Sequence, residues 1–140
     1  MKAILFLRKP QLSIYTLSLG QGGRDEVREC LLDAKNPSAD AAIKGMVALI
    51  DRAAKYGTHK LPSELFKCWR PRKRKGPLFC EFMKGRLRIG CFQFGKEKKL
   101  LLVSAFRKSK WKETAHYDRA VERYQEFCSD PHWEDRDDTE

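Results

Sequence analysis

The residues of this chain best suited to chemistry are arginines and lysines that recur in its second half. Arg86 and Arg88 lie two residues apart in an alternating segment, so they share one face of a predicted strand. Guanidinium and ammonium groups bind phosphate directly, and a group of them suits a polyphosphate ligand. A second group stands on a proline-containing segment that is expected to cross the surface as an electrostatic arm: Arg70, Arg72, Lys73, Arg74 and Lys75.

The net charge of +10 is divided unevenly along the chain. Residues 67–112 hold 16 basic and 2 acidic side chains, whereas residues 1–66 hold 10 and 7, and residues 113–140 hold 3 and 10. A central cationic segment attracts polyanions by electrostatic steering and counterion release. Nucleic acid is therefore the predicted partner. A membrane surface is not expected, because no predicted helix carries a basic polar face.

A length of 140 residues, with 41% hydrophobic and 34% charged residues, predicts one globular domain. No apolar run approaches the roughly 20 residues that span a bilayer, and residues 3–7 are too short for a signal peptide. A cytoplasmic protein is expected. The cysteines are odd in number and form no CxxC pair, so free thiols and no metal or other cofactor are expected. They are Cys30, Cys68, Cys80, Cys91 and Cys128.

Hydrophobic periodicity predicts an α+β fold that begins with a strand and a helical hairpin. Residues 3–7 and 12–19 are both strand-like, and one of the two is expected to persist as a strand. Asp25 caps a predicted helix that reaches about Lys35, and Ser38 caps a longer helix that ends at Gly57.

The second half is predicted to form a small antiparallel sheet and a closing helix. Residues 61–75 contain Pro62 and Pro71 and are expected to be a surface loop. The closing helix follows Thr114, and residues 129–140, with six acidic side chains, are expected to be a mobile or loosely docked tail. The three predicted strands are 78–83, 87–94 and 100–106.

Four segments together carry a more specific signal: residues 61–65, 87–92, 100–108 and 117–120. The most telling feature is an apolar strand that runs directly into Phe-Arg-Lys-Ser-Lys and is followed by a helix opening on Tyr-x-x-Ala. In this order, after a helical hairpin, the segments resemble the RelE/ParE toxin superfamily, and in particular its HigB-like and phage-derived members. The resemblance covers roughly residues 25–128. The expected organisation is a toxin domain of residues 1–128 followed by an acidic tail of residues 129–140.

The resemblance implies the toxin of a type II toxin–antitoxin system. Such a toxin cuts messenger RNA on the ribosome without a metal, by directing a ribose 2′-hydroxyl onto the adjacent phosphate. This chemistry needs a nucleotide held in line, proton transfers at two oxygens and cations around the developing charge. The resemblance also implies a cognate antitoxin, often a helix-turn-helix protein.

The same resemblance suggests roles for individual residues. Arg88 matches the arginine that contacts the scissile phosphate, and Arg107 and Lys108 match the basic pair that ends the last strand, so the three are expected to hold one phosphate. Tyr117 matches the tyrosine at the start of the closing helix, which stacks on a base or relays a proton, and His116 beside it is a second candidate. RNA contacts are also expected from Arg86, Lys110 and the five cations of residues 70–75.

The chain departs from the family pattern at the expected general base. Where the best-known members carry two lysines before the hairpin, this chain has Phe79 and Glu81. Glu81 either abstracts the proton or pairs with Arg88 across the strands. Tyr117 also fits the apolar stripe of its helix, so packing and catalysis both remain open for it, whereas His116 lies off that stripe.

Two alternative functions remain open at this point. One is a ParE-type inhibitor of DNA gyrase, which does no chemistry itself, and the other is a non-catalytic, phage-derived nucleic-acid-binding protein. A further hypothesis is that the acidic tail folds back over residues 67–112 and weakens RNA binding at low salt.

Overall fold

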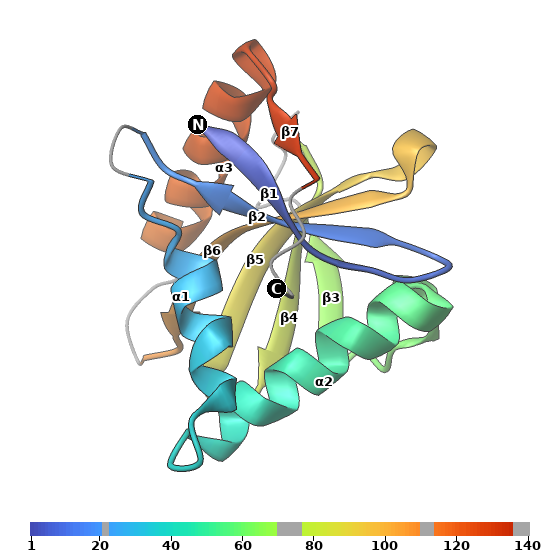
Figure 1. Ribbon diagram of the computed structural model, residues 1–140, viewed down its shortest axis with the longest axis vertical. Coiled ribbons are helices and arrows are strands. Elements are labelled where there is room, and N and C mark those ends of the chain that lie inside the picture. Colours follow the sequence, from blue (N-terminus) through green and yellow to red (C-terminus); the bar gives the residue numbers. More distant parts are fainter. Residues whose placement is uncertain (21–22, 70–76, 110–113, 136–140) are drawn as a thin grey trace.

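The computed structural model describes residues 1–20, 23–69, 77–109 and 114–135. Within these ranges the chain forms an α+β fold of three α-helices and a seven-stranded mixed sheet, in the strand order β3-β4-β5-β6-β2-β1-β7. Helices cover both faces of the sheet (Figure 1). None of the helices in the described ranges is long and apolar enough to cross a membrane.

Both N-terminal apolar runs are strands, so the expectation that one would persist is wrong. β1 (Lys2–Arg8) and β2 (Ser13–Ser18) form an antiparallel hairpin, and β2 pairs in parallel with β6 (Lys99–Arg107). Ile14 of β2 is fully buried on one face and Tyr15 on the other. A strand covered on both faces needs apolar residues throughout, which explains the weak alternation of these runs.

The strands predicted in the second half are confirmed as β4 (Phe79–Lys84), β5 (Leu87–Phe94) and β6. The expected loop before them is wrong for β3 (Phe66–Trp69), which pairs antiparallel with β4 at the sheet edge. Phe66 explains the difference, because it is only 9% exposed and its ring lies 4.8 Å from that of Phe82. Two flanking prolines obscured this short strand in the sequence.

One face of the sheet is covered by α1 (Glu26–Leu32) and α2 (Ala41–Tyr56), seen in front in Figure 1. Asp25 caps α1 as predicted, accepting a hydrogen bond from the Arg28 backbone N–H. The predicted cap at Ser38 is wrong: Asp40 caps α2 by accepting from the Ala42 N–H at 2.7 Å. The buried residues of α2 recur at helical spacing: Ile43, Met46, Leu49, Ile50, Ala53 and Ala54.

The other face is covered by α3 (Thr114–Ser129), whose buried side chains pack on the aromatic residues of the sheet. After α3 the chain forms a two-residue strand, β7 (Trp133–Glu134), which pairs in parallel with β1. The Trp133 ring packs edge-on against Tyr15, Phe94 and Phe127, with ring centroids 4.8 to 5.1 Å apart. The expectation of a loosely docked tail is therefore wrong for its first part.

Asp135 fastens the end of the described chain to β1 and β2. Its carboxylate accepts hydrogen bonds from the Tyr15 hydroxyl at 2.6 Å and from Arg8 Nη2 at 2.9 Å, and these bonds lower the pKa of Asp135. This part of the tail lies beside β1, on the far side of the sheet from β3. Trp133 contacts residues 67–112 at Phe94 and at Lys99, whose Nζ lies 4.4 Å from the Trp133 ring centroid. The rest of the tail, residues 136–140, lies outside the described residues.

The expectation of free thiols is wrong for two cysteines. Cys68 and Cys80 lie directly opposite each other on β3 and β4 and form a disulfide. Within the described ranges, the cysteines that remain as thiols are Cys30, Cys91 and Cys128. The pairing depends on the register of β3, a strand that the sequence did not reveal.

Gly90 of β5 provides a test of this packing. A Cβ atom there would overlap Ser104 Oγ and lie 2.7 Å from the Phe79 ring. We expect Gly90→Ala to lower the free energy of unfolding by about 1–3 kcal/mol through overpacking. Gly95→Ala is the matched control, because a Cβ there meets nothing within 4 Å. Urea denaturation of both variants checks this, and equal stabilities would contradict the described register of β5 and β6.

Candidate nucleic-acid interface

The candidate interface lies at the end of the sheet where the β4–β5 turn, the last residues of β6 and the first turn of α3 come together. Arg88 sits opposite Met83 on β4 and Phe106 on β6. Its chain neighbours Leu87 and Ile89 belong to the core under α1 and α2, so Arg88 lies on the α3 face. On that face Phe106 stacks on His116 of α3, with ring centroids 3.9 Å apart and planes 5° apart.

Arg88 is held in place by three groups of the protein. Nη1 donates to the backbone carbonyls of Gly85 and Leu87 at 2.8 and 3.0 Å, and Nε lies 3.8 Å from Oε1 of Glu81. The Arg88 side chain is 11% exposed. Among the described residues, Nη2 has no hydrogen-bond partner. The guanidinium is thus fixed at the surface and keeps donor capacity for an external acceptor.

Glu81 is buried in β4, where it is 1% exposed. It lies opposite Lys67 on β3 and opposite Gly90 on β5, and its carboxylate forms the ion pair with Arg88. Of the two roles considered for Glu81, pairing is therefore present in the structure. A buried ion pair of this kind fixes the orientation of both side chains. Removal of one partner leaves the charge of the other uncompensated.

The predicted trio of Arg88, Arg107 and Lys108 does not converge on one point. Arg107 lies opposite Leu87, on the face covered by α1 and α2, where its Nη2 pairs with Asp40 at 3.0 Å. Lys108 follows β6, and its backbone N–H donates to the Arg86 carbonyl at 2.7 Å. Arg88 and Arg107 are thus on opposite faces of the sheet, and the expectation of one shared phosphate is wrong.

The two proton-transfer candidates on α3 differ in exposure. Tyr117 is 5% exposed and packs edge-on against Phe79 at 5.5 Å, so it belongs to the core of this face. His116 is partly exposed and covers Phe106. The sequence analysis missed Phe106. The available signal was its place at the start of the Phe-Arg-Lys-Ser-Lys motif.

Other candidates lie in parts of the chain that the structure leaves undescribed. These are Lys110 and the arm residues Arg70, Arg72, Lys73, Arg74 and Lys75. Near the described part of the interface, Arg86 is exposed in the β4–β5 turn. No group of acidic, histidine or cysteine side chains within the described ranges could hold a metal ion.

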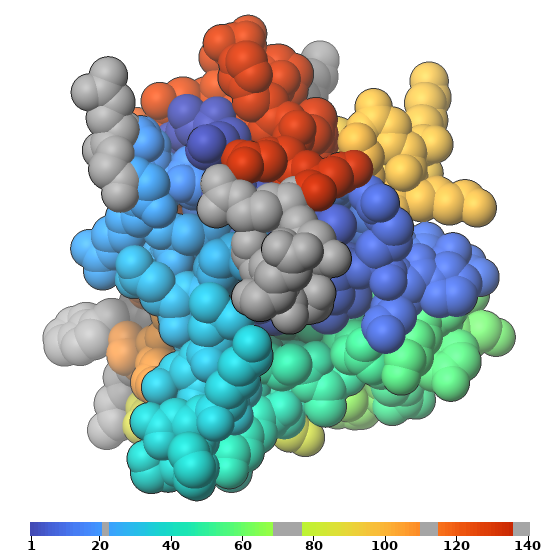
Figure 2. All heavy atoms as spheres, in the orientation of Figure 1, coloured from blue at the N-terminus to red at the C-terminus, as the bar shows by residue number. Residues whose placement is uncertain are grey.

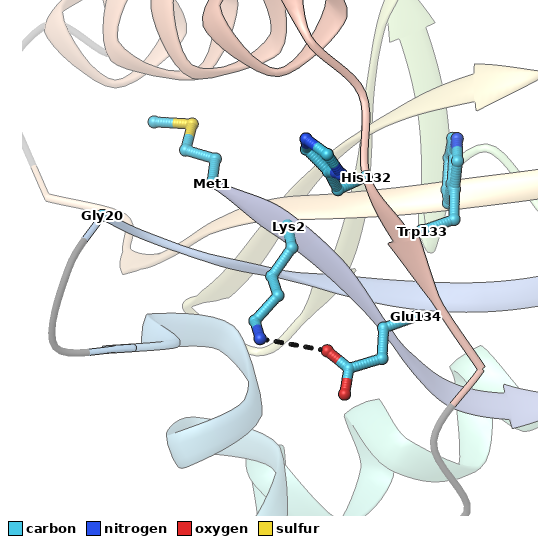
Figure 3. Close-up of a pocket in the computed structure, with 6 residues that line it drawn as sticks. All are labelled: Met1, Lys2, Gly20, His132, Trp133 and Glu134. Carbon is cyan, nitrogen blue, oxygen red and sulfur yellow. Dashed lines mark ion pairs between the residues drawn. The ribbon is translucent and has the colours of Figure 1, made fainter.

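Two hollows lie away from this interface. One, of about 350 Å³, is formed by the chain start and β7, where Lys2 pairs with Glu134 at 3.2 Å (Figure 3). The other is a groove of about 1120 Å³ lined by residues of β1, α1 and α2. Helices α1 and α2 lie on the face that Figure 2 presents. Neither is lined by Arg88 or His116.

Comparisons with protein-family models, with curated proteins and with solved structures found no match to this chain.

A double-mutant cycle tests the coupling of Glu81 to Arg88. We expect Glu81→Gln to lower the free energy of unfolding by about 1–3 kcal/mol, because the partly buried guanidinium loses its counter-charge. The Glu81→Gln/Arg88→Gln double variant should lose less than the sum of the singles, by about 1 kcal/mol. Urea denaturation gives the four values. Additivity of the two single effects would show that the pair is not coupled.

Proposed function

We propose that this chain is a RelE/ParE-type toxin that cleaves messenger RNA bound to the ribosome. The observation that supports this most strongly is the Arg88 guanidinium, fixed by Glu81 and two backbone carbonyls beside the stacked Phe106–His116 pair. A fixed cation next to an aromatic surface suits a phosphate and its flanking base. The proposal includes a cytoplasmic location and an antitoxin partner.

In this proposal Arg88 binds the scissile phosphate. The transition state of 2′-hydroxyl attack carries more negative charge on the phosphate oxygens than the ground state does. A guanidinium that is already oriented stabilises that charge without having to reorganise. Arg86 and Lys108, which the 2.7 Å backbone hydrogen bond brings together, extend the cationic surface along the RNA backbone.

His116 is the proposed proton-transfer group. The reaction moves one proton from the 2′-hydroxyl and delivers one to the leaving 5′-oxygen. Glu81 is 1% and Tyr117 5% exposed, whereas His116 is partly exposed at the same end of the sheet. Imidazole also suits proton transfer near neutral pH. Stacking on Phe106 holds the plane of the His116 imidazole, and the other face of the imidazole would support a stacked base.

Replacing Arg88 is the main test. We expect Arg88→Ala to reduce cleavage of ribosome-bound messenger RNA by at least about 100-fold, the typical cost of removing one oriented transition-state donor. Arg24→Ala is the matched control: it removes the same charge from a side chain that is 77% exposed at the start of α1. Primer extension on messenger RNA from ribosome complexes measures both. An equal loss of cleavage in the two variants would show that Arg88 acts only through the net charge of the protein.

Substitutions on α3 separate proton transfer from packing. We expect His116→Ala to lower kcat by about 100-fold or more, while Tyr117→Phe, which keeps the ring against Phe79, leaves kcat within about threefold. Single-turnover cleavage on programmed ribosomes gives these rates. A large loss in Tyr117→Phe, with little loss in His116→Ala, would assign the proton transfer to the tyrosine instead.

The second candidate function is a nucleic-acid-binding protein that does no chemistry, which includes a gyrase inhibitor. It is favoured by the small number of reactive groups at the interface, because Glu81 is paired, Tyr117 is packed and Arg107 faces the other way. Binding of RNA without cleavage on the ribosome would support it. Inhibition of gyrase supercoiling by the purified protein would select the ParE-type version.

A further inference from the structure

Three cysteines form a row across one edge of the sheet. Cys68 on β3 lies opposite Cys80 on β4, and Cys80 lies opposite Cys91 on β5. Cys68 and Cys80 are joined as a disulfide, whereas Cys91 is a thiol. All three side chains contribute to the core under α1 and α2. This row is independent of Arg88 and of the α3 face.

The disulfide closes a covalent ring that contains the cationic arm. Its two cysteines are 12 positions apart, and the residues between them include all five cations of the 70–75 segment. β3 is a four-residue strand at the sheet edge, and β4 is its strand neighbour in the described sheet. The cross-link therefore fastens a short edge strand at the point where the chain enters the arm.

We propose that Cys68 and Cys80 form a reversible thiol–disulfide site that controls the attachment of β3 to β4. The oxidant is a low-molecular-weight disulfide such as oxidised glutathione, and the reductant is a dithiol. In a reducing cytoplasm structural disulfides are rare, and those that occur are mostly transient or redox-sensing. A cross-link in a protein expected there fits a reversible role.

The exchange balances without any other reactant. Oxidation converts the Cys68 and Cys80 thiols and one glutathione disulfide into the protein disulfide and two glutathione thiols. In reduction, one thiolate of the dithiol attacks Cys68 Sγ, forms a mixed disulfide and releases Cys80 as a thiolate, which takes up a proton. The second thiol of the reductant then displaces Cys68 and leaves as an intramolecular disulfide.

The surroundings define which sulfurs react. Cys68 is partly exposed at the edge, whereas Cys80 is fully buried, so an external thiolate reaches Cys68 first. The Gln93 side-chain amide lies 3.7 Å from Cys80 Sγ and 3.9 Å from Cys68 Sγ, where its N–H can donate to a departing thiolate. Burial raises the pKa of Cys91 well above its usual value, so this third thiol stays protonated and does not compete.

The consequence for binding rests on the function proposed above. The disulfide keeps the two ends of the intervening segment on paired strands, so less entropy should be lost when the cations between them bind an RNA backbone. The oxidised protein should therefore bind RNA more tightly than the reduced protein. Attachment of β3, by contrast, depends only on the cross-link and is measurable without RNA.

The first experiment compares full-length wild-type protein in oxidised and reduced glutathione buffers. Alkylation and mass spectrometry should find a Cys68–Cys80 cross-linked peptide in the oxidised state, and alkylated Cys68 and Cys80 after treatment with dithiothreitol. Hydrogen exchange at Phe66–Trp69 should become at least about tenfold faster on reduction, because a short edge strand opens locally. Failure to form the cross-link, or equal exchange in the two states, overturns the proposal.

The second experiment measures binding of a short oligouridylate RNA to the same two states. We expect the oxidised protein to bind at least about fivefold more tightly, and this difference should vanish in the Cys68→Ser/Cys80→Ser variant and persist in Cys128→Ser. A redox-dependent affinity that survives in the double serine variant overturns control by this site. Loss of RNA cleavage with intact redox-dependent exchange at β3 would instead count against the proposed ribonuclease.

Discussion

The parallel pairing of β2 with β6 is the constraint on which the rest of the structure depends. It extends from Ser13 opposite Lys99 to Thr16 opposite Leu102, and it joins the N-terminal hairpin to the antiparallel strands of the second half. Beyond Thr16 the pairing ends, while β6 continues to Arg107. This continuation carries Phe106 and Lys108 to the candidate interface. There the antiparallel pairing of β6 with β5 sets Phe106 opposite Arg88.

Charged side chains complete the sheet where the pairing of β2 with β6 ends. Arg123 of α3 donates to the Val103 carbonyl at 2.8 Å and pairs with Glu26 of α1 at 2.7 Å. It thus gives a part-buried strand carbonyl a partner and links the two helical layers. Nearby, Thr16 donates to the buried Asp25 carboxylate at 2.6 Å, and Arg28 reaches the Leu5 carbonyl at 2.6 Å. Burial raises the pKa of Asp25, although the hydrogen bonds from Thr16 and from the Arg28 backbone N–H oppose the shift. Polar groups buried this way stabilise a fold only when nearly all are satisfied.

The sequence predicted well those features that depend on local patterns. The α2 stripe, the β4–β5 hairpin and the α3 stripe all follow from apolar spacing and turn residues near in the chain. The Asp25 cap is likewise a local signal. The fold class and most of these helices and strands could therefore be predicted from the sequence.

The features that the sequence did not predict depend on register between distant segments. The side of the sheet on which Arg107 lies is set by its pairing with Leu87. The pairing of β5 with β6 shifts register between Gly90 and Cys91, and no spacing rule in the sequence indicates such a shift. The Cys68–Cys80 disulfide needs β3, and the docking of Trp133 needs the aromatic cluster around Tyr15 and Phe127. The β3 strand and the docked Trp133 both arise from tertiary packing, which outweighs a local sequence pattern typical of a loop or a tail.

The central claim is that the cationic end of this sheet directs a ribose 2′-hydroxyl onto the neighbouring phosphate. The most direct measurement is the chemical identity of the new 3′ end, determined by mass spectrometry of messenger RNA recovered from ribosomes incubated with the purified protein. We predict a 2′,3′-cyclic phosphate and a partner fragment that begins with a 5′-hydroxyl. A new 3′-hydroxyl with a 5′-phosphate, or messenger RNA that stays intact, would contradict the account.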